Sequence, residues 1–393
     1  MPILRPFIGL VYDEGVAGPL DSLTAPPYDA ITAVDQDRYY GSSPSNVIRL
    51  ILGKEAEGDD GTNNKYTRAA SHLRSWRDQG ILVTTKEPCF YPYELDFRFG
   101  GRLRRVRGVI AEVELEPWGG SIIPHERTFP GPMEDRLSLI RAVRANLSPI
   151  YGLITGPSEE LTRFLDRAMA SPADREVTDE QGTRHRLWAK AGHGEKLGQS
   201  LREERLLIAD GHHRYSVALA FRDEMRTTVG AGPWDSMMVL IVDGATEDPP
   251  VLPIHRVVRA DDTAPEPPGD RVRDMAEVLA SLRDDDLTYG TVRLDQGEVI
   301  HAVARVSGSP PTVCALHERV LDRMTRADIR YVPDSVQAER AVMTGEASAA
   351  YLLTPTRVQR VWEVVGRNGR LPQKSTYFWP KPRTGMIIRP FVH

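Results

Sequence analysis

The sequence predicts a mixed α/β fold, because short β-branched or alternating runs recur along the chain between stretches of helical periodicity. At 393 residues the chain is longer than one typical core, which allows two packed domains or one elaborated domain. Its 40% of hydrophobic and 27% of charged residues are typical of an ordinary globular protein.

Strand and helix are predicted in turn over the N-terminal quarter of the chain. Residues 7–12 form an apolar run that indicates a strand, and residues 24–29 contain two adjacent prolines, which favour a stiff, extended loop. The run 45–52 is short and β-branched, so it predicts another strand. Residues 65–79 carry apolar side chains at helical spacing and predict a helix.

A β-hairpin is the clearest prediction for the next segment. Residues 90–97 alternate in polarity, a glycine pair follows, and residues 106–113 are again strand-like. Amphipathic helices are expected over about 134–145 and after Pro157, where acidic residues occupy the first turn.

The second half begins with an apolar strand over residues 205–209, followed by a helix from about Tyr215 to Glu224. Further strands are expected over 237–242 and 251–258.

A stretch rich in proline and charge then indicates a linker. We therefore expect a site-bearing α/β domain over residues 1–259, a linker over 260–272, and a C-terminal α/β domain over 273–393. The final segment of the C-terminal domain is expected to be able to return to the site.

The bulk properties of the chain exclude several classes of protein. The formal net charge of −5 and the isoelectric point near 6.1 argue against broad nucleic-acid binding, although residues 102–107 form a dense basic run. Cys89 and Cys314 are the only cysteines, so neither a disulfide framework nor a multi-cysteine zinc site is expected. No signal peptide and no apolar run of about 20 residues is present, so we expect a cytoplasmic protein without a membrane partner. A homo-oligomer is compatible with the sequence.

The strongest candidate for a functional site is the turn Ala209-Asp210-Gly211-His212-His213-Arg214. A glycine turn between a buried strand and a helix presents free amide groups and the positive end of a helix dipole, which favour a phosphate. Arg214 can clamp that anion, a histidine can donate a proton, and Asp210 can hold magnesium (Mg2+) or orient a hydroxyl. The alternative is that Asp210 caps the helix and the histidines cover its surface.

A second candidate is the loop His125-Glu126-Arg127, which places a base, an acid and a cation at adjacent positions. Glu126 is a plausible general base for a substrate hydroxyl, and His125 and Arg127 are candidates for phosphate binding. A solvated turn that leads into the next helix is the structural alternative.

Other polar residues are weaker candidates for substrate binding. They lie in the proline-rich loop, in the predicted strand 45–52, and near the C-terminus beside an aromatic pair: Tyr28, Asp29, Arg49, Lys374, Ser375 and Thr376. A zinc site formed by His125, His212 and His213 is less favoured, because adjacent histidines seldom bind one ion together. Walker, dinucleotide-glycine and esterase-elbow motifs are absent from the sequence.

Six segments, in order along nearly the whole chain, together resemble the bacterial and archaeal family catalogued as domain of unknown function 1015 (DUF1015). These segments are residues 25–29, 46–50, 124–128, 209–215, 252–256 and 374–378. The resemblance implies a relationship and leaves the activity open.

The motif Asp210-Gly211-His212-His213-Arg214 is also similar to the signature of free serine kinases that share the ParB/sulfiredoxin fold. This resemblance implies a ParB/sulfiredoxin-like nucleotide-binding core, with extra strands and helices. It further implies that Gly211, His212, His213 and Arg214 hold nucleotide phosphates and that Asp210 lies beside the transferred group. Those kinases activate serine with a glutamate, for which Glu126 is the candidate here.

The residues and the resemblance together predict phosphoryl transfer to a small hydroxy compound. A free serine kinase-like activity with ADP or ATP and Mg2+ is favoured, with Glu126, Asp210 and His213 as catalytic residues. A phosphoserine phosphatase and a non-catalytic, ParB-like nucleotide sensor remain open alternatives. A metal-dependent hydrolase is the third.

Overall fold

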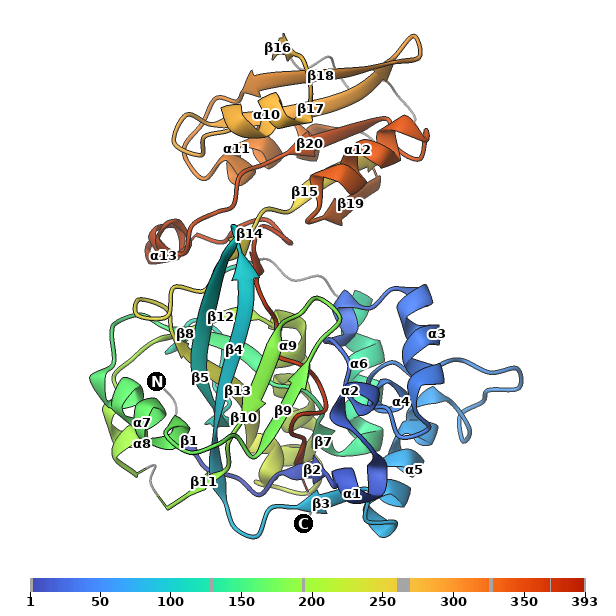
Figure 1. Ribbon diagram of the computed structural model, residues 1–393, viewed down its shortest axis with the longest axis vertical. Helices are drawn as coiled ribbons and strands as arrows, with labels where there is room; N and C mark the ends of the chain where they lie inside the picture. The colour runs from blue at the N-terminus through green and yellow to red at the C-terminus, as the bar shows by residue number, and fades with distance from the viewer. Residues whose placement is uncertain are drawn as a thin grey trace. The chain divides into compact units, whose positions relative to one another are not determined.

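The computed structural model describes residues 3–126, 131–192, 195–259, 269–324, 328–367 and 369–391. The chain divides into two compact units: unit 1 comprises residues 1–123, 129–249 and 380–393, and unit 2 comprises 124–128 and 250–379 (Figure 1). The division falls at Pro249–Pro250, before the expected linker. Of that linker, residues 269–272 form a strand, and residues 260–268 lie outside the described part of the chain.

Unit 1 is built on a mixed sheet, for which ten strands are described. Strand β13 is parallel to β8 and antiparallel to β5, and β5 forms a long antiparallel hairpin with β4, as the sequence predicted. In sheet order the strands are β6 (Ile122–Pro124), β12 (Leu206–Asp210), β8 (Ile150–Ile154), β13 (Ser236–Asp243), β5 (Arg102–Glu114), β4 (Cys89–Phe99), β10 (Arg184–Leu187) and β9 (Arg175–Thr178), with β1 (Leu4–Arg5) on β5 and β11 (Lys190–Ala191) on β4.

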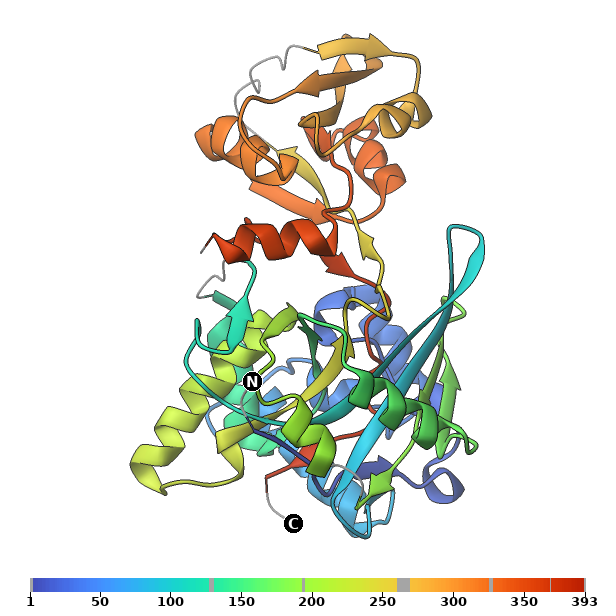
Figure 2. The same cartoon turned by 90° about the vertical axis from the view of Figure 1, so that its left-hand side faces the viewer.

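Helices surround this sheet and complete unit 1 (Figure 2). They are α1 (Glu14–Ala17), α2 (Leu20–Leu23), α3 (Ala33–Ser42), α4 (Ile48–Ile51), α5 (Lys65–Asp78), α6 (Gly131–Val143), α7 (Glu159–Met169), α8 (Glu195–Ser200) and α9 (His212–Thr228), with the 3-10 turns Tyr28–Ala30 and Pro233–Asp235. Two small sheets pair β2 (Leu10–Tyr12) with β3 (Leu82–Thr84), and β7 (Ala145–Asn146) with β22 (Arg389–Pro390).

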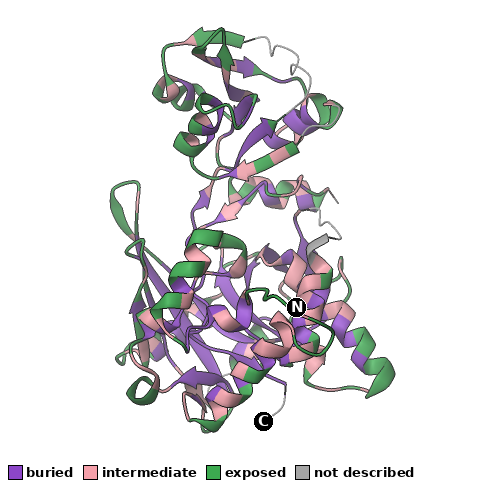
Figure 3. Ribbon diagram, turned by 90° about the vertical axis from the view of Figure 1, so that its right-hand side faces the viewer, coloured by how far each residue is buried: buried purple, intermediate pink, exposed green. Residues whose placement is uncertain are grey.

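Helix α9 contributes apolar side chains to two separate clusters of unit 1. Tyr215 and Ala218 join the main core together with sheet strands and α7, whereas Val217 and Phe221 pack in a second cluster with Ile140 of α6. Burying apolar side chains on both sides fixes the helix firmly, at roughly 1.5–3 kcal/mol for each large side chain. The first turns of α9, beside the predicted site, are therefore fixed by the packing of Tyr215 and Val217; purple marks the buried residues of the protein in Figure 3.

The prediction of a strand over residues 45–52 is wrong, because this segment contains the helix α4. Asn46 is fully buried, its side-chain oxygen accepts a hydrogen bond from the amide of Ile48 at 2.8 Å, and its side-chain amide donates to the carbonyl of Ser22. This local bonding turns the backbone into a helical turn. A short apolar run that is buried on all sides does not distinguish a strand from a helix by its pattern.

Unit 2 contains an antiparallel sheet, described in the order β16 (Gly269–Val272), β18 (Glu298–Arg305), β17 (Thr288–Asp295), β20 (Ala349–Leu352), β15 (His255–Arg259) and β19 (Asp328–Val332). Its helices are α10 (Met275–Ser281), α11 (Thr312–Arg319), α12 (Ser335–Met343) and α13 (Val358–Gly366), with a 3-10 turn at Leu321–Arg323. The single strand expected over 251–258 is divided into β14 (Val251–Leu252), which pairs with β21 (Tyr377–Phe378), and β15.

The mixed α/β class predicted from the sequence is confirmed. Throughout the described ranges, no helix is both long enough and apolar enough to span a membrane.

Candidate functional site

The turn between β12 and α9 has the shape that the sequence predicted. Gly211 has φ = 98°, a left-handed conformation that glycine adopts without strain. A Cβ atom at this position would lie 2.6 Å from Cγ2 of Ile150 and 3.1 Å from Nη2 of Arg214. Both the backbone angle and the close approach of Ile150 therefore require glycine here, and they allow the strand to pass directly into the helix.

A network of four charged side chains lies at this turn. Oδ2 of Asp210 is 2.5 Å from Nη2 of Arg214, and Oδ1 of Asp210 is 2.6 Å from Nζ of Lys381. The same Nζ atom lies 2.6 Å from Oδ2 of Asp29. The four side chains are only 8–21% exposed. Two carboxylates and two cations thus alternate in a partly desolvated environment, where charge interactions are stronger than in water.

Arg214 has further partners within unit 1. Its Nη1 atom donates to the hydroxyl of Ser148 at 2.9 Å and to the carbonyl of Pro149 at 2.7 Å. In this structure its guanidinium is therefore directed into the protein, rather than projecting as an unoccupied anion clamp. A phosphate that binds at the positions of these partners would replace Asp210 or Ser148 as a partner of Arg214.

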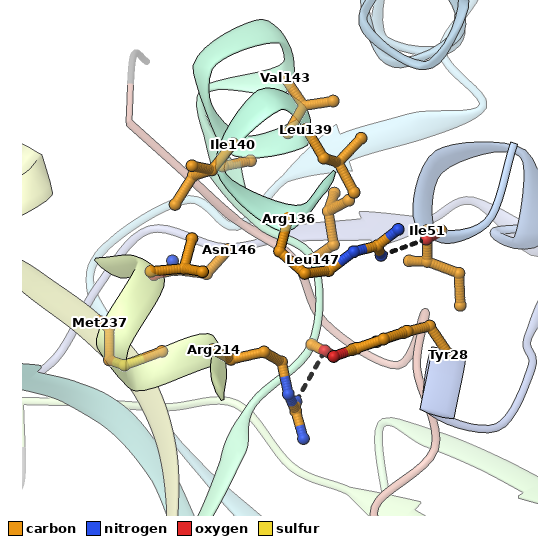
Figure 4. A pocket seen from close by; sticks show the side chains of 13 residues that line it. Tyr28, Ile51, Arg136, Leu139, Ile140, Val143, Asn146, Leu147, Arg214 and Met237 are labelled. Carbon is orange, nitrogen blue, oxygen red and sulfur yellow. Dashed lines mark hydrogen bonds between the residues drawn. The ribbon is translucent and has the colours of Figure 1, made fainter. Parts of the chain in front are cut away.

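Arg214 also lines a small pocket in unit 1 that is partly open to solvent (Figure 4). Most of its wall is apolar and comes from α6, α9 and the segment 145–148, whereas Tyr28, Arg136 and Ser148 add polar groups. The guanidinium of Arg136 lies 4.3 Å from the centre of the Tyr28 ring, and its Nη1 donates to the carbonyl of Ile51. An apolar cavity with a few convergent polar groups is the usual form of a small-molecule site.

The electrostatics of Tyr28 reflect both the cavity and the charge network. Burial raises the pKa of its hydroxyl above the ordinary value and Asp29 raises it further, whereas Arg214 and Arg136 act in the opposite direction. Tyr28 therefore remains protonated at neutral pH and is a hydrogen-bond donor at the cavity wall.

The two histidines of the motif differ in environment. His212 is 8% exposed, and its ring stacks on Trp118 with the ring centres 6.1 Å apart and an angle of 22° between the planes. This packing favours a structural role for His212. His213 is half-buried, which leaves it accessible to a ligand.

The predicted base, Glu126, lies in unit 2 in a nest of hydrogen-bond donors. Its Oε1 accepts from the amides of Ser375 and Thr376 and from the hydroxyl of Thr376, each at 2.9 Å, and its Oε2 accepts from the amide of Lys374 at 2.9 Å. His125, fully buried, contacts the same hydroxyl through Nε2 at 2.7 Å. Glu126 therefore fastens the segment 374–376 to its own loop.

The predicted site residues thus form two groups, one in each unit. Unit 1 brings together residues from the proline-rich loop, the β12–α9 turn and α9, namely Tyr28, Asp29, Asp210, Gly211 and Arg214. Unit 2 brings together His125, Glu126, Lys374, Ser375 and Thr376. Arg49 joins neither group: its Nη2 donates to the carbonyl of Tyr40, and its guanidinium stacks on that ring at 4.4 Å. Arg127 lies outside the described residues.

Three residues of the unit 1 site were not predicted, namely Lys381, Arg136 and Ser148. Lys381 stands between two prolines, and this rigid Pro-Lys-Pro segment was a signal that could have identified it. Arg136 and Ser148 carried no such signal, because a charged helix residue and a loop serine are common on protein surfaces.

Among the residues that the structure describes, no group of three or more histidine, cysteine, aspartate or glutamate side chains is arranged to hold a metal ion. Both oxygens of Asp210, the predicted magnesium ligand, are engaged by cations. The donor set at the turn therefore does not fit a metal ion bound by the protein.

Comparison with solved structures gives distant similarities. A free serine kinase in complex with AMP is 16% identical, with a TM-score of 0.40 over 68% of this chain and 86% of its own. A conserved hypothetical protein from Pyrococcus furiosus is 15% identical (TM-score 0.39, 70% and 92% covered), and C-terminally truncated SbnI from Staphylococcus aureus is 11% identical (0.36, 71% and 81%). Because both the identities and the TM-scores are low, these structures carry no argument about function, which is argued below from the residues of this chain.

A search of curated proteins gave no match. Residues 4–364 match the family described as "Protein of unknown function (DUF1015)", which covers most of the sequence. The match includes the turn at Gly211, both charged partners Asp210 and Arg214, and the loop of Glu126. The chain therefore belongs to the DUF1015 family.

Proposed function

We propose that unit 1 binds the phosphates of ADP or ATP at the β12–α9 turn and transfers a phosphoryl group to a small hydroxy compound, with free serine as the first acceptor to test. The observation that carries this proposal is the network of Asp29, Asp210, Arg214 and Lys381 at the start of a 17-residue helix. The positive end of the helix dipole favours an anion at this point, and Arg214 and Lys381 become available to a phosphate when it takes the place of their carboxylate partners.

The proposed reaction depends on an exchange of partners by Arg214. A phosphate oxygen that binds Arg214 in two-point fashion replaces Oδ2 of Asp210, which now lies 2.5 Å from that guanidinium. The exchange leaves Oδ2 available to a substrate hydroxyl, while Lys381 continues to hold Oδ1. Asp210, rather than Glu126, is then the candidate proton acceptor.

In the transfer step, the acceptor hydroxyl oxygen forms a bond to the terminal phosphorus of the nucleotide and its proton passes to Asp210. The bond from that phosphorus to the bridging oxygen breaks, and the leaving nucleotide keeps the electron pair. Arg214, Lys381 and the amides of the turn compensate the charge on the migrating group. Because the donor set does not fit a protein-bound metal ion, no residue is assigned to hold Mg2+; magnesium that accompanies the nucleotide is part of the substrate.

A non-catalytic nucleotide-binding module is the second candidate, and one observation favours it. The expected base Glu126 accepts four hydrogen bonds from residues 374–376, an arrangement that suits a structural role rather than proton transfer. A module of this kind binds ADP through the same turn and releases it unchanged.

Phosphorus NMR of the purified protein with serine and either ADP or ATP tests the proposal. The expected result is a phosphoserine resonance together with AMP or ADP, which is absent when serine is omitted. Phosphoserine incubated without nucleotide provides a parallel sample, in which release of inorganic phosphate would identify a phosphatase instead.

Two variants of α9 give the test a matched control. Arg214→Gln is expected to lose nucleotide binding, whereas Arg226→Gln removes an arginine of the same helix whose side chain is 49% exposed and is expected to keep it. Asp210→Asn is expected to bind nucleotide and to lose turnover. Nucleotide binding without turnover in the unsubstituted protein supports the module, and equal binding by the Arg214 and Arg226 variants contradicts the proposed site.

A further inference from the structure

The hairpin of β4 and β5 extends beyond its neighbours in the sheet of unit 1. Strand β10 pairs with β4 only as far as Asp96, and β13 pairs with β5 only as far as Gly108. Residues 97–107 therefore form a two-stranded arm whose strands pair with each other beyond these points. Figures 2 and 3 show its tip standing clear of the sheet, with exposed residues at the turn. We call residues 97–107 the arginine arm.

The arginine arm is strongly basic. It carries five arginines and no acidic residue, in a chain whose formal net charge is −5. Arg105 pairs with Glu94 and Asp96, and Arg107 pairs with Asp166 and Glu247.

The arginines nearest the tip are different. Both Arg98 and Arg102 are exposed, and neither makes an ion pair with another described residue. Their charges are therefore available to a partner.

The register of the hairpin also places an apolar side chain beside these charges. Leu103 of β5 lies directly opposite Arg98 of β4. Side chains two residues apart on a strand point to the same face, so Arg105 lies on the same face as Leu103 and Arg98. Leu103 is 73% exposed and Arg105 57%. An exposed leucine flanked by arginines is a composition typical of a protein interface, in which arginine is enriched and lysine depleted.

Unit 1 also carries a complementary surface. The loop between α4 and α5, which stands out at the right of Figure 1, contains the acidic residues Glu55, Glu57, Asp59 and Asp60. The side chain of Glu55 is 79% exposed and pairs with Lys65, Asp59 pairs with Arg68, and Glu57 is exposed without an ion pair to another described residue. We call residues 55–60 the acidic loop.

We infer that the arginine arm of one copy of this chain docks on the acidic loop of a second copy, so that two copies form a two-fold dimer. In such a dimer each arm meets the partner's loop, and every contact occurs twice. A nucleic acid is the less suitable occupant, because three of the five arginines, Arg104, Arg105 and Arg107, are already paired with carboxylates and the acidic chain as a whole repels a polyanion.

Sedimentation velocity of the full chain over a concentration series tests this inference. Self-association is expected at about 0.02 M salt and is expected to weaken at about 0.5 M, because exposed charges are screened. The double variants Arg98→Glu/Arg102→Glu and Glu55→Lys/Glu57→Lys are each expected to weaken dimerisation on the order of 100-fold, since like charges then face each other. A 1:1 mixture of the two variants restores opposite charges at both contacts and is expected to dimerise.

The matched control is Arg163→Glu/Arg167→Glu on α7, which makes the same charge change at arginines that are 60% and 68% exposed. It is expected to dimerise like the unsubstituted chain, and circular dichroism of all variants verifies that they are folded. The inference is overturned by a chain that stays monomeric at every concentration, by a dimer that neither double variant weakens, or by a mixture that fails to associate. Binding of a labelled oligonucleotide by a monomeric chain, lost in the arm variant, overturns it in favour of a polyanion.

Discussion

Replacement of Lys381 by methionine perturbs the charge network of unit 1 at its centre. Its Nζ atom lies 2.6 Å from a carboxylate oxygen of both Asp29 and Asp210, and its side chain is 8% exposed. Methionine retains most of the aliphatic chain and removes only the charge, so two carboxylates are left facing each other. Removing one partner of a buried ion pair costs about 3–5 kcal/mol. Since Asp210 keeps Arg214 and Asp29 is 21% exposed, we expect Lys381→Met to lower the free energy of unfolding by about 2–4 kcal/mol.

Urea unfolding followed by circular dichroism measures this loss. Lys54→Met is the control, because the Lys54–Asp37 pair is 42% and 71% exposed and is expected to contribute less than about 1 kcal/mol. Adding Asp29→Asn to Lys381→Met removes the repulsion and is expected to recover part of the stability. A Lys381→Met protein as stable as the Lys54→Met protein would refute the network as a buried, mutually dependent unit.

Three further predictions concern single positions. Gly211→Ala, with φ = 98° and a Cβ 2.6 Å from Ile150, is expected to lose about 2–4 kcal/mol in thermal unfolding. Gly41→Ala, where nothing lies within 4 Å, should be close to neutral, and equal effects of the two would contradict the strain argument. Glu126→Gln is expected to lower stability by about 1–3 kcal/mol and to preserve any serine phosphorylation by the folded protein; loss of turnover at unchanged stability would restore Glu126 as the base. Burial, with a smaller contribution from Arg256, lowers the pKa of His255 to about 4. In the unfolded chain a histidine titrates near about 6.5, so above that pH His255 is neutral in both states and does not affect stability. As the pH falls toward 4, His255 takes up a proton only in the unfolded chain, which lowers the free energy of unfolding by up to about 3 kcal/mol. The urea midpoint of the protein should therefore fall over this range, and less steeply in His255→Gln.

Local patterns predicted the elements that position the unit 1 site. The alternation in residues 90–113 predicted β4 and β5, the apolar run before Asp210 predicted β12, and the helical spacing after Gly211 predicted α9. Each pattern is set by residues that are close together in the sequence. Gly211 was predictable for the same reason, because the passage from strand to helix requires a backbone angle that favours glycine.

Contacts between distant parts of the chain were not predictable from these patterns. Lys381 reaches Asp29 across more than 300 positions, and Glu126 binds the amides of residues 374–376 across about 250. The acid–base composition of the Glu126 loop indicated catalysis, whereas its hydrogen bonds suit the fastening of a loop. The role of a polar side chain depends on its hydrogen-bond and ion-pair partners, and the sequence does not show which residues these are.

Isothermal titration of ADP into the unsubstituted protein and into the Arg214→Gln and Arg226→Gln variants tests the central claim most directly. If the turn at Gly211 binds phosphate with the help of Arg214, the unsubstituted protein and the Arg226 variant bind one ADP per chain with equal affinity. The Arg214 variant should bind at least about tenfold more weakly, which corresponds to one lost charge-assisted contact. Failure of the unsubstituted protein to bind ADP or ATP, or full affinity in the Arg214 variant, would contradict the claim.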